Sequence, residues 1–167
     1  MVSPLPAPAC WPMSPNSPIK LRELSLEDCT RIWTWWEDEA RAQGQTTAPQ
    51  DPAVPNPAAW HAQINEDQGL RHMRYGIWAG SELIGDIALQ DLDWHNGTAT
   101  TGMGLRSGLR NQGLGQKALA LLLDLARHLE LKQLSARTDK NNGPAIGSLL
   151  ASGFSSIDQE NFVRALD

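Results

Sequence analysis

The chain has 167 residues, of which 41% are hydrophobic and 20% are charged, a composition typical of a globular protein with one well-packed core. Its net charge of −5 argues against a nucleic-acid-binding protein. Its two cysteines, Cys10 and Cys29, are too few for a disulfide framework, so we interpret both as free thiols in a reducing, cytoplasmic setting. No apolar run reaches the roughly 18 residues that a membrane span needs, and no membrane association is expected.

Six prolines lie within residues 1–18, a density that prevents regular secondary structure. This segment has no basic start and no unbroken apolar stretch, so it does not read as a secretory signal. We predict a flexible, extended arm over residues 1–18, followed by a single domain over residues 19–167. An arm anchored by Trp11 that covers a substrate is the alternative.

The first elements follow from periodicity. Residues 19–24 alternate between apolar and polar side chains and predict a strand. Ser25, with Asp28 three residues later, predicts the capped start of a helix that runs to residue 42. The stripe expected to face its core is Leu26, Cys29, Ile32, Trp33 and Trp36. Four prolines make residues 44–57 irregular, and Asn56 caps a second helix that buries Trp60 and Ile64.

The middle of the chain predicts a run of strands. Residues 74–79 and 82–92 form two of them, joined by a tight Gly80-Ser81 turn. The His95-Asn96-Gly97 segment is a strong turn signal and leads into a strand over residues 98–105.

The clearest helix covers residues 113–129. Its expected buried face is Leu114, Ala118, Leu121, Leu122, Leu125 and Leu129. A strand over 133–138, a helix over 142–152 closed by Gly153, and short strands over 154–157 and 162–166 complete the order. The pattern predicts an α/β fold with helices on both faces of a mixed sheet.

The segment Arg110-Asn111-Gln112-Gly113-Leu114-Gly115 stands directly before that helix. Backbone N–H groups at a helix start have no partner inside the helix and carry partial positive charge. Glycines remove the Cβ atoms that would keep a ligand away from these groups. The loop is therefore suited to holding a pyrophosphate.

Two other phosphate-binding motifs fit less well. A phosphate-loop NTPase needs a lysine where Leu114 stands. A dinucleotide-binding motif fits residues 113–118 and has Asp139 at the end of the next strand. In that motif the first glycine follows its strand almost immediately, whereas the polar stretch 106–112 intervenes here.

The same loop resembles the cofactor loop of the GNAT acetyltransferases, through Arg110, Gly113 and Gly115. The family's later signature matches at Asn142, Ala145, Gly153 and Phe154. The opening LRELSLED sequence resembles the ribosomal-protein N-terminal acetyltransferase (RimJ/RimL-like) branch. The resemblance covers residues 19–167. It implies the GNAT fold, a mostly antiparallel twisted sheet of six to seven strands with about four helices on both faces, and a bacterial, cytoplasmic enzyme.

The resemblance further implies acetyl-CoA as acetyl donor, an amine as acceptor, no metal, and a monomer or homodimer. Met103, Gly104 and Leu105 would offer backbone groups to the pantetheine arm. The N–H groups that would hold the pyrophosphate are those of Asn111, Gln112, Gly113, Leu114, Gly115 and Gln116. Asn142 would face the cofactor arm; the alternatives are that it only caps its helix, and that Gly102 and Gly104 only mark a β-bulge.

The catalytic residues stay unassigned. The family's glutamate is missing from residues 98–101, and Leu149 stands at its tyrosine position, while the only tyrosine, Tyr75, is in an early strand. The other candidates for proton transfer are Asp86, Asp91, Asp93, His95 and Ser148. Trp35 and the acidic run 37–39 are candidates for acceptor contacts. We expect an N-acetyltransferase acting on a primary amine by direct transfer in a ternary complex, with a catalytically silent acyl-CoA-binding module as the alternative.

Overall fold

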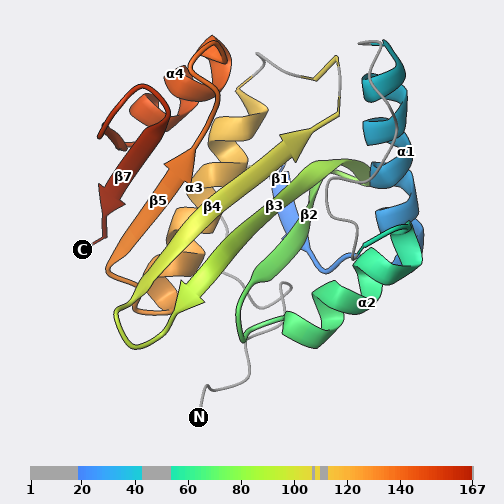
Figure 1. The fold of residues 1–167 in the computed structure, drawn as a ribbon, viewed down its shortest axis with the longest axis horizontal. Helices are drawn as coiled ribbons and strands as arrows, with labels where there is room; N and C mark the ends of the chain where they lie inside the picture. Colours follow the sequence, from blue (N-terminus) through green and yellow to red (C-terminus); the bar gives the residue numbers. More distant parts are fainter. Residues whose placement is uncertain (1–18, 43–53, 107, 110–112, 167) are drawn as a thin grey trace.

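The computed structural model describes residues 19–42, 54–106, 108–109 and 113–166 (Figure 1). The strands are β1 (Ile19–Arg22), β2 (Met73–Ala79), β3 (Glu82–Asp93), β4 (Thr98–Leu105), β5 (Gln133–Arg137), β6 (Ser155–Ser156) and β7 (Asn161–Ala165). The helices are α1 (Leu26–Ala42), α2 (Pro57–Asp67), α3 (Leu114–His128) and α4 (Gly143–Ala151). The strands form one sheet in the order β1-β2-β3-β4-β5-β7-β6, in which β4 and β5 pair parallel and the other neighbours pair antiparallel. The predicted mixed, mostly antiparallel sheet is confirmed.

The predicted helix signals are confirmed at three helix ends. Ser25 and Asp28 form a reciprocal capping box, in which each backbone N–H donates to the other side chain at 3.0 and 3.1 Å. The side chain of Asn56 accepts from the N–H of Ala59 at 2.8 Å. Gly153, with a φ of 89°, ends α4, and its N–H and that of Phe154 return to the carbonyls of Leu150 and Leu149.

Several predicted strands are too long. The first strand ends at Arg22, because Leu24 leaves the sheet to pack between β2 and the α1–α2 layer. The strand predicted over 154–157 is only Ser155–Ser156, and the one predicted over 133–138 ends at Arg137. The last strand, predicted over 162–166, has the predicted length but lies one residue earlier, at Asn161–Ala165. Ile157 is 65% exposed because the chain bends away from the sheet after β6.

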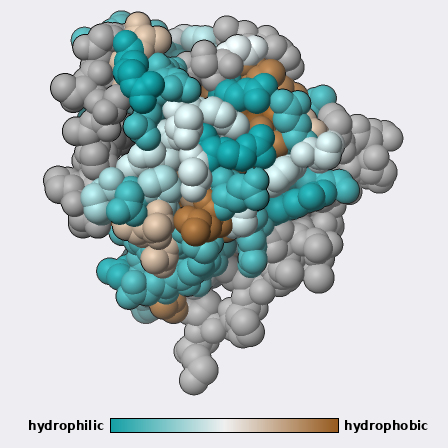
Figure 2. Space-filling model, turned by 90° about the vertical axis from the view of Figure 1, so that its right-hand side faces the viewer, coloured by the Kyte–Doolittle hydropathy of each residue, from teal (hydrophilic) through white to brown (hydrophobic). Residues whose placement is uncertain are grey.

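Two apolar layers enclose the sheet. On one face, alternate residues of β2 and β3, such as Tyr75 and Ile87, pack in one cluster with the leucines of α3. On the other face, Leu83 packs with Cys29 of α1 and Trp60 of α2. The helices thus lie on both faces, with α1 and α2 together on one of them (Figure 1). The described outer surface on the α1–α2 side is mainly hydrophilic, with small separate apolar patches (Figure 2).

The predicted core stripe of α1 is correct in part. Cys29 and Ile32 are buried, but Leu26 is 47% exposed and Trp36 is 42% exposed. Trp36 instead contacts Trp33 and Trp60 with tilted rings, whose centroids lie 5.8 and 4.7 Å from its own. The buried stripe of α1 is therefore narrower than the sequence suggested, because α1 packs mainly against α2 and against Leu83 at the start of β3.

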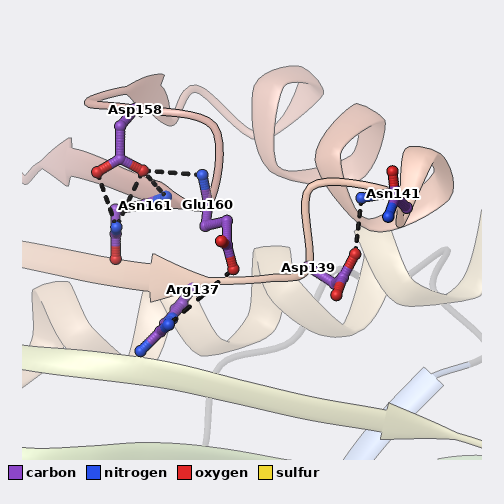
Figure 3. A network of polar contacts seen from close by, with 6 residues as sticks. All are labelled: Arg137, Asp139, Asn141, Asp158, Glu160 and Asn161. Carbon is purple, nitrogen blue, oxygen red and sulfur yellow. Dashed lines mark hydrogen bonds and ion pairs between the residues drawn. The ribbon is translucent and has the colours of Figure 1, made fainter.

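The loop between β6 and β7 is organised by one carboxylate (Figure 3). Asp158 Oδ1 accepts the backbone N–H groups of Glu160 and Asn161 at 2.8 and 2.9 Å, and the Asn161 amide reaches both carboxylate oxygens at 2.9 Å. These hydrogen bonds, led by the backbone N–H of Glu160, hold the pKa of Asp158 below its ordinary value of 3.8. The charged form is the one that closes the loop.

We expect Asp158→Asn to lower the Tm by about 2–4 °C at neutral pH. Because the folded pKa of Asp158 is depressed, the stabilisation is complete above the ordinary pKa and is lost as the pH falls through the folded value. Thermal unfolding of both proteins between pH 7 and pH 2 would show the difference closing below pH 3.8. Asp124→Asn, which breaks only a surface ion pair with Arg127, is the control and should change little. A difference that stays constant to pH 2 would contradict the assignment.

Candidate functional site

Strand β4 leaves its parallel neighbour halfway along its length. It pairs with β5 from Thr98 to Thr101, where Thr101 lies opposite Ala136. From Gly102 to Leu105 it continues beside β3, while β5 continues beside β7. Gly102, Met103 and Gly104 therefore do not pair with β5, and two of them, Met103 and Gly104, are among the residues that the GNAT resemblance places along the pantetheine arm. Such an edge can hydrogen-bond an extended amide-bearing ligand as an added strand would.

Helix α3 begins close to this edge, since its first turn lies near Met103 and Leu105 of β4. Gly113 is the N-cap, with a φ of 78°, and it makes no side-chain capping bond. No acidic residue lies in the first turn, and Gln116 and Lys117 are exposed. A Cβ atom at position 113 would meet nothing within 4 Å among the described residues. Within the described part of the chain, no acidic side chain of the first turn neutralises the partial positive charge of this helix start, which favours an anionic ligand.

Gly115 lies where the first turn of α3 meets β4. It is buried, and a Cβ atom there would lie 3.2 Å from Met103 Cε and 3.5 Å from Leu105 Cδ1. The second glycine of the loop therefore allows the first turn of α3 to approach β4. Met103, 41% exposed, lies at this junction between the strand edge and the helix start, and Leu114 packs at the border of the core.

The structure describes only some of the other residues of the predicted cofactor site. Arg110, Asn111 and Gln112 lie outside the described residues. Asn142 caps α4, its side chain accepting from the N–H of Ala145 at 3.2 Å. Its contact with a cofactor arm stays a prediction.

Gly102 and Gly104 do not mark a bulge. Both hold regular register with β3, opposite Ala88 and Asp86, and the irregularity in this pair of strands lies between Gln90 and Asp93. A Cβ atom at 102 would come 2.9 Å from Gln90 Oε1, and one at 104 would come 3.2 Å from Asp86 Oδ1. The glycines make room for two polar side chains of β3 that lie over β4.

Asp86 is buried and forms an ion pair with Arg74 of β2 through Oδ2. Burial raises the pKa of Asp86, while the charge and hydrogen bond of Arg74 lower it, with the net shift upward. The guanidinium of Arg74 also lies 5.7 Å from the ring centroid of Trp60, on the α1–α2 face. The sequence singled out Asp86 but carried no signal for Arg74, because register and diagonal reach decide this pairing.

The other candidates for proton transfer lie elsewhere. Asp93 caps the β3–β4 turn, accepting from the backbone N–H of Asn96 at 3.0 Å, and Asp91 and exposed His95 flank the same turn. This hairpin is at the far end of β4 from α3's first turn (Figure 1), so none of the three joins the site. Burial raises the pKa of Tyr75 to about 12, and Tyr75 faces the α3 layer.

Two further positions that the sequence singled out lie on α4. Ser148 is half-buried, and Leu149, at the family's tyrosine position, is buried in the core.

One contact was missed from the sequence. Arg106, just after β4, has its guanidinium 5.6 Å from the Trp35 ring centroid and donates to Glu82 at 3.1 Å. Arg31 lies near the same ring at 5.9 Å. Trp35, a candidate for acceptor contacts, therefore connects α1 to Arg106, which follows β4. The acidic run is partly neutralised, since Glu37 and Asp38 pair with Arg41.

Among the described residues, no helix is long and apolar enough to cross a membrane. No group of three or more acidic, histidine or cysteine side chains in the described part of the chain is arranged to hold a metal ion.

Solved structures share this fold at low sequence identity. Microcin C7 self-immunity acetyltransferase MccE, solved with acetyl-CoA and AMP, is 15% identical, with 90% of this chain and 94% of that chain covered and a TM-score of 0.72. Ribosomal-protein-S5-alanine acetyltransferase from Vibrio fischeri is 14% identical, with 90% and 94% covered and a TM-score of 0.72. The ribosomal L7/L12 acetyltransferase RimL, solved with coenzyme A, is 15% identical, with 93% and 97% covered and a TM-score of 0.73.

A sequence search of curated proteins finds no match. The family model described as the acetyltransferase (GNAT) domain matches residues 19–155, which include all strands to the start of β6 and all four helices. This match is independent of the structural similarities and agrees with them. The chain belongs to the GNAT acetyltransferase family and is an acyltransferase.

Proposed function

We propose that the protein is an acetyl-CoA-dependent N-acetyltransferase that moves an acetyl group directly to a primary amine in a ternary complex. The observation that carries the proposal is the second half of β4, which has no partner in β5 and lies against the first turn of α3. An extended, amide-bearing arm ending in a pyrophosphate fits this pair of features. The arm would add to the strand edge, and the pyrophosphate would meet the helix start.

The residues divide into two groups on this proposal. Gly102, Met103 and Gly104 present the strand edge, and the N–H groups around Gly113 to Gln116 receive the phosphates. The amine would approach from the α1–α2 face, where Gln90 and Asp86 lie over β4. Holding amine and thioester together in this way supplies a large part of the rate enhancement.

The acceptor we favour is a peptide N-terminus, as in the ribosomal-protein branch. Two similar structures carry names of that activity, one for S5 alanine and one for L7/L12, and the opening LRELSLED sequence supports the same branch. A small polyamine is the second candidate, because a spermidine acetyltransferase chimera shares the fold with a TM-score of 0.71.

A thiol-release assay with acetyl-CoA tests the proposal. The acceptors would be an alanyl peptide, a seryl peptide and spermidine, with acetyl-CoA-induced thermal stabilisation measured in parallel. Acceptor-dependent release of CoA is the expected result. Stabilisation by acetyl-CoA without release from any acceptor would favour the silent binding module, whose motivation is the missing glutamate and tyrosine. If acetyl-CoA neither stabilises the protein nor releases CoA with any acceptor, the proposed site is contradicted.

Two substitutions at Asn142 would separate its role as the cap of α4 from a contact with the cofactor. Asn142→Ala removes the cap and should cost about 1 kcal/mol of stability, together with CoA affinity if the amide also contacts the cofactor. Asn142→Ser keeps an oxygen that can cap α4 but removes the amide, so we expect a Tm near that of the wild type and a CoA affinity several-fold weaker. Thermal unfolding and CoA titration measure both. Wild-type affinity in Asn142→Ser would leave Asn142 as a cap alone.

A further inference from the structure

Asp86 is the one charged residue that is buried among those the structure describes, at 3% exposure. It lies on the α1–α2 face of β3, between Gly76 of β2 and Gly104 of β4. Burying a carboxylate costs free energy that an apolar side chain would not. We interpret this cost as functional, because Asp86 lies beside the part of β4 that does not pair with β5.

The two carboxylate oxygens lie in different surroundings. Oδ2 accepts from Arg74 Nη1, and the pair is held by the Arg74 contact with Trp60. Oδ1 lies over Gly104, where any side chain larger than hydrogen would come to 3.2 Å of it. One oxygen is thus fixed by an arginine, and the other lies over Gly104 on the α1–α2 face of β4.

We propose that the carboxylate of Asp86 takes the proton from the acceptor amine during acetyl transfer. The inference rests on the proposed function, because it requires a thioester along β4. The amine nitrogen forms a bond to the acetyl carbon, the carbon–sulfur bond breaks, and sulfur leaves with that electron pair. The amine proton passes to Asp86 directly or through one water, and returns to solvent or to the departing thiolate, so that atoms and charges balance.

The charges around Asp86 suit this task. Arg74 pairs with it from β2, and the Cys29 thiol of α1 lies near enough for the charges of Asp86 and Arg74 to affect its pKa. On β4, Gly104 lies opposite Asp86 in the sheet. Burial raises the pKa of the Cys29 thiol to about 12, so the thiol does not compete as a base. Burial lowers the pKa of His72, two residues before Arg74, and Arg74 lowers it further. A carboxylate with a raised pKa is a stronger base than an ordinary aspartate.

The test compares Asp86→Asn with Asp93→Asn, a carboxylate at the far turn of the same strand. With the best acceptor of the panel, Asp86→Asn should reduce kcat/KM at least about 100-fold while acetyl-CoA still stabilises the protein. Asp93→Asn should keep nearly full activity. The kcat/KM of the wild type should also fall as the pH is lowered, with the same midpoint for a peptide and for spermidine. Asp86→Asn should not show this fall. A folded Asp86→Asn protein with activity within threefold of wild type would overturn the proposal.

A second measurement does not depend on turnover or on the variant's folding. The Asp86 carboxyl ¹³C signal of the wild-type protein would be assigned by through-bond correlation and titrated with and without acetyl-CoA. We expect a midpoint above the ordinary 3.8 and a signal that shifts when acetyl-CoA binds. A signal unaffected by bound acetyl-CoA would overturn the placement of Asp86. Wild-type inactivity with every acceptor would instead count against the proposed function, and the titration would still decide the position of Asp86.

Discussion

Gly85→Ala is expected to destabilise the protein by about 3 kcal/mol or more, the range of severe overpacking. A Cβ atom at position 85 would lie 2.1 Å from the carbonyl oxygen of Gly104 and 3.1 Å from Leu105 Cα. These are backbone atoms of the neighbouring strand and no side-chain rotation relieves the overlap. Strands β3 and β4 would have to separate at the Gly85–Leu105 pair.

The same separation would move the strand edge proposed to bind the pantetheine arm, so CoA affinity should fall along with stability. Gly147→Ala in α4 is the matched control, because a Cβ atom there meets nothing within 4 Å and alanine favours a helix by roughly 0.5–1 kcal/mol. Urea unfolding would measure both variants. A Gly85→Ala protein with wild-type stability would show that β3 and β4 can shift apart at this point without loss.

The parts of the fold that local chemistry determines were predictable from sequence. The capping box at Ser25, the cap at Asn56 and the glycine stop at Gly153 each depend on residues within four positions of one another. The amphipathic period of α3 identified Leu121, Leu122 and Leu125 as core residues but missed the buried Leu119 and Leu123. The predicted Leu114 and Leu129 are only half-buried. Family resemblance then supplied the mostly antiparallel pairing of the sheet, which local patterns do not contain.

The parts that depend on contacts distant in sequence were not predictable. The Arg74–Asp86 pair joins β2 and β3, and Arg106 joins the end of β4 to Trp35 of α1. Trp36 was assigned to the core from its period alone, but it covers Trp60 from the solvent side. In each case the decisive information is the register and packing of two elements, which the spacing within one element does not give.

The two glycines of the loop before α3 also differ in how far the sequence predicted their roles. The sequence favoured Gly113 and Gly115 as residues that clear space for phosphates. Gly113 lies at an uncapped helix start as expected, while Gly115 is buried and allows α3 to approach Met103. A glycine pair in a motif thus serves two purposes, one toward the ligand and one toward the scaffold.

Gln116→Glu is expected to change stability and CoA affinity in opposite directions. A negative charge in the first turn of α3 interacts favourably with the helix dipole and should stabilise the protein by about 0.3–1 kcal/mol. The same charge would repel a pyrophosphate at the helix start, and at a separation of roughly 6 Å in a partly solvated site the cost is about 1.4 kcal/mol, or tenfold in Kd. Gln116 is exposed, so the substitution disturbs no packing.

Ala120→Glu places the same charge one turn further along α3, also at an exposed position, and serves as the control. The effect of the helix dipole falls off within the first turn, so this variant should change Tm and Kd much less. The loss of affinity in Gln116→Glu should shrink in high salt, because exposed charges are screened over about 10 Å at 0.1 M ionic strength. Equal affinities in Gln116→Glu and Ala120→Glu would mean that the start of α3 does not receive the phosphates. A higher Tm together with weaker CoA binding in Gln116→Glu alone would locate the phosphates there, since a general loss of structure would lower both.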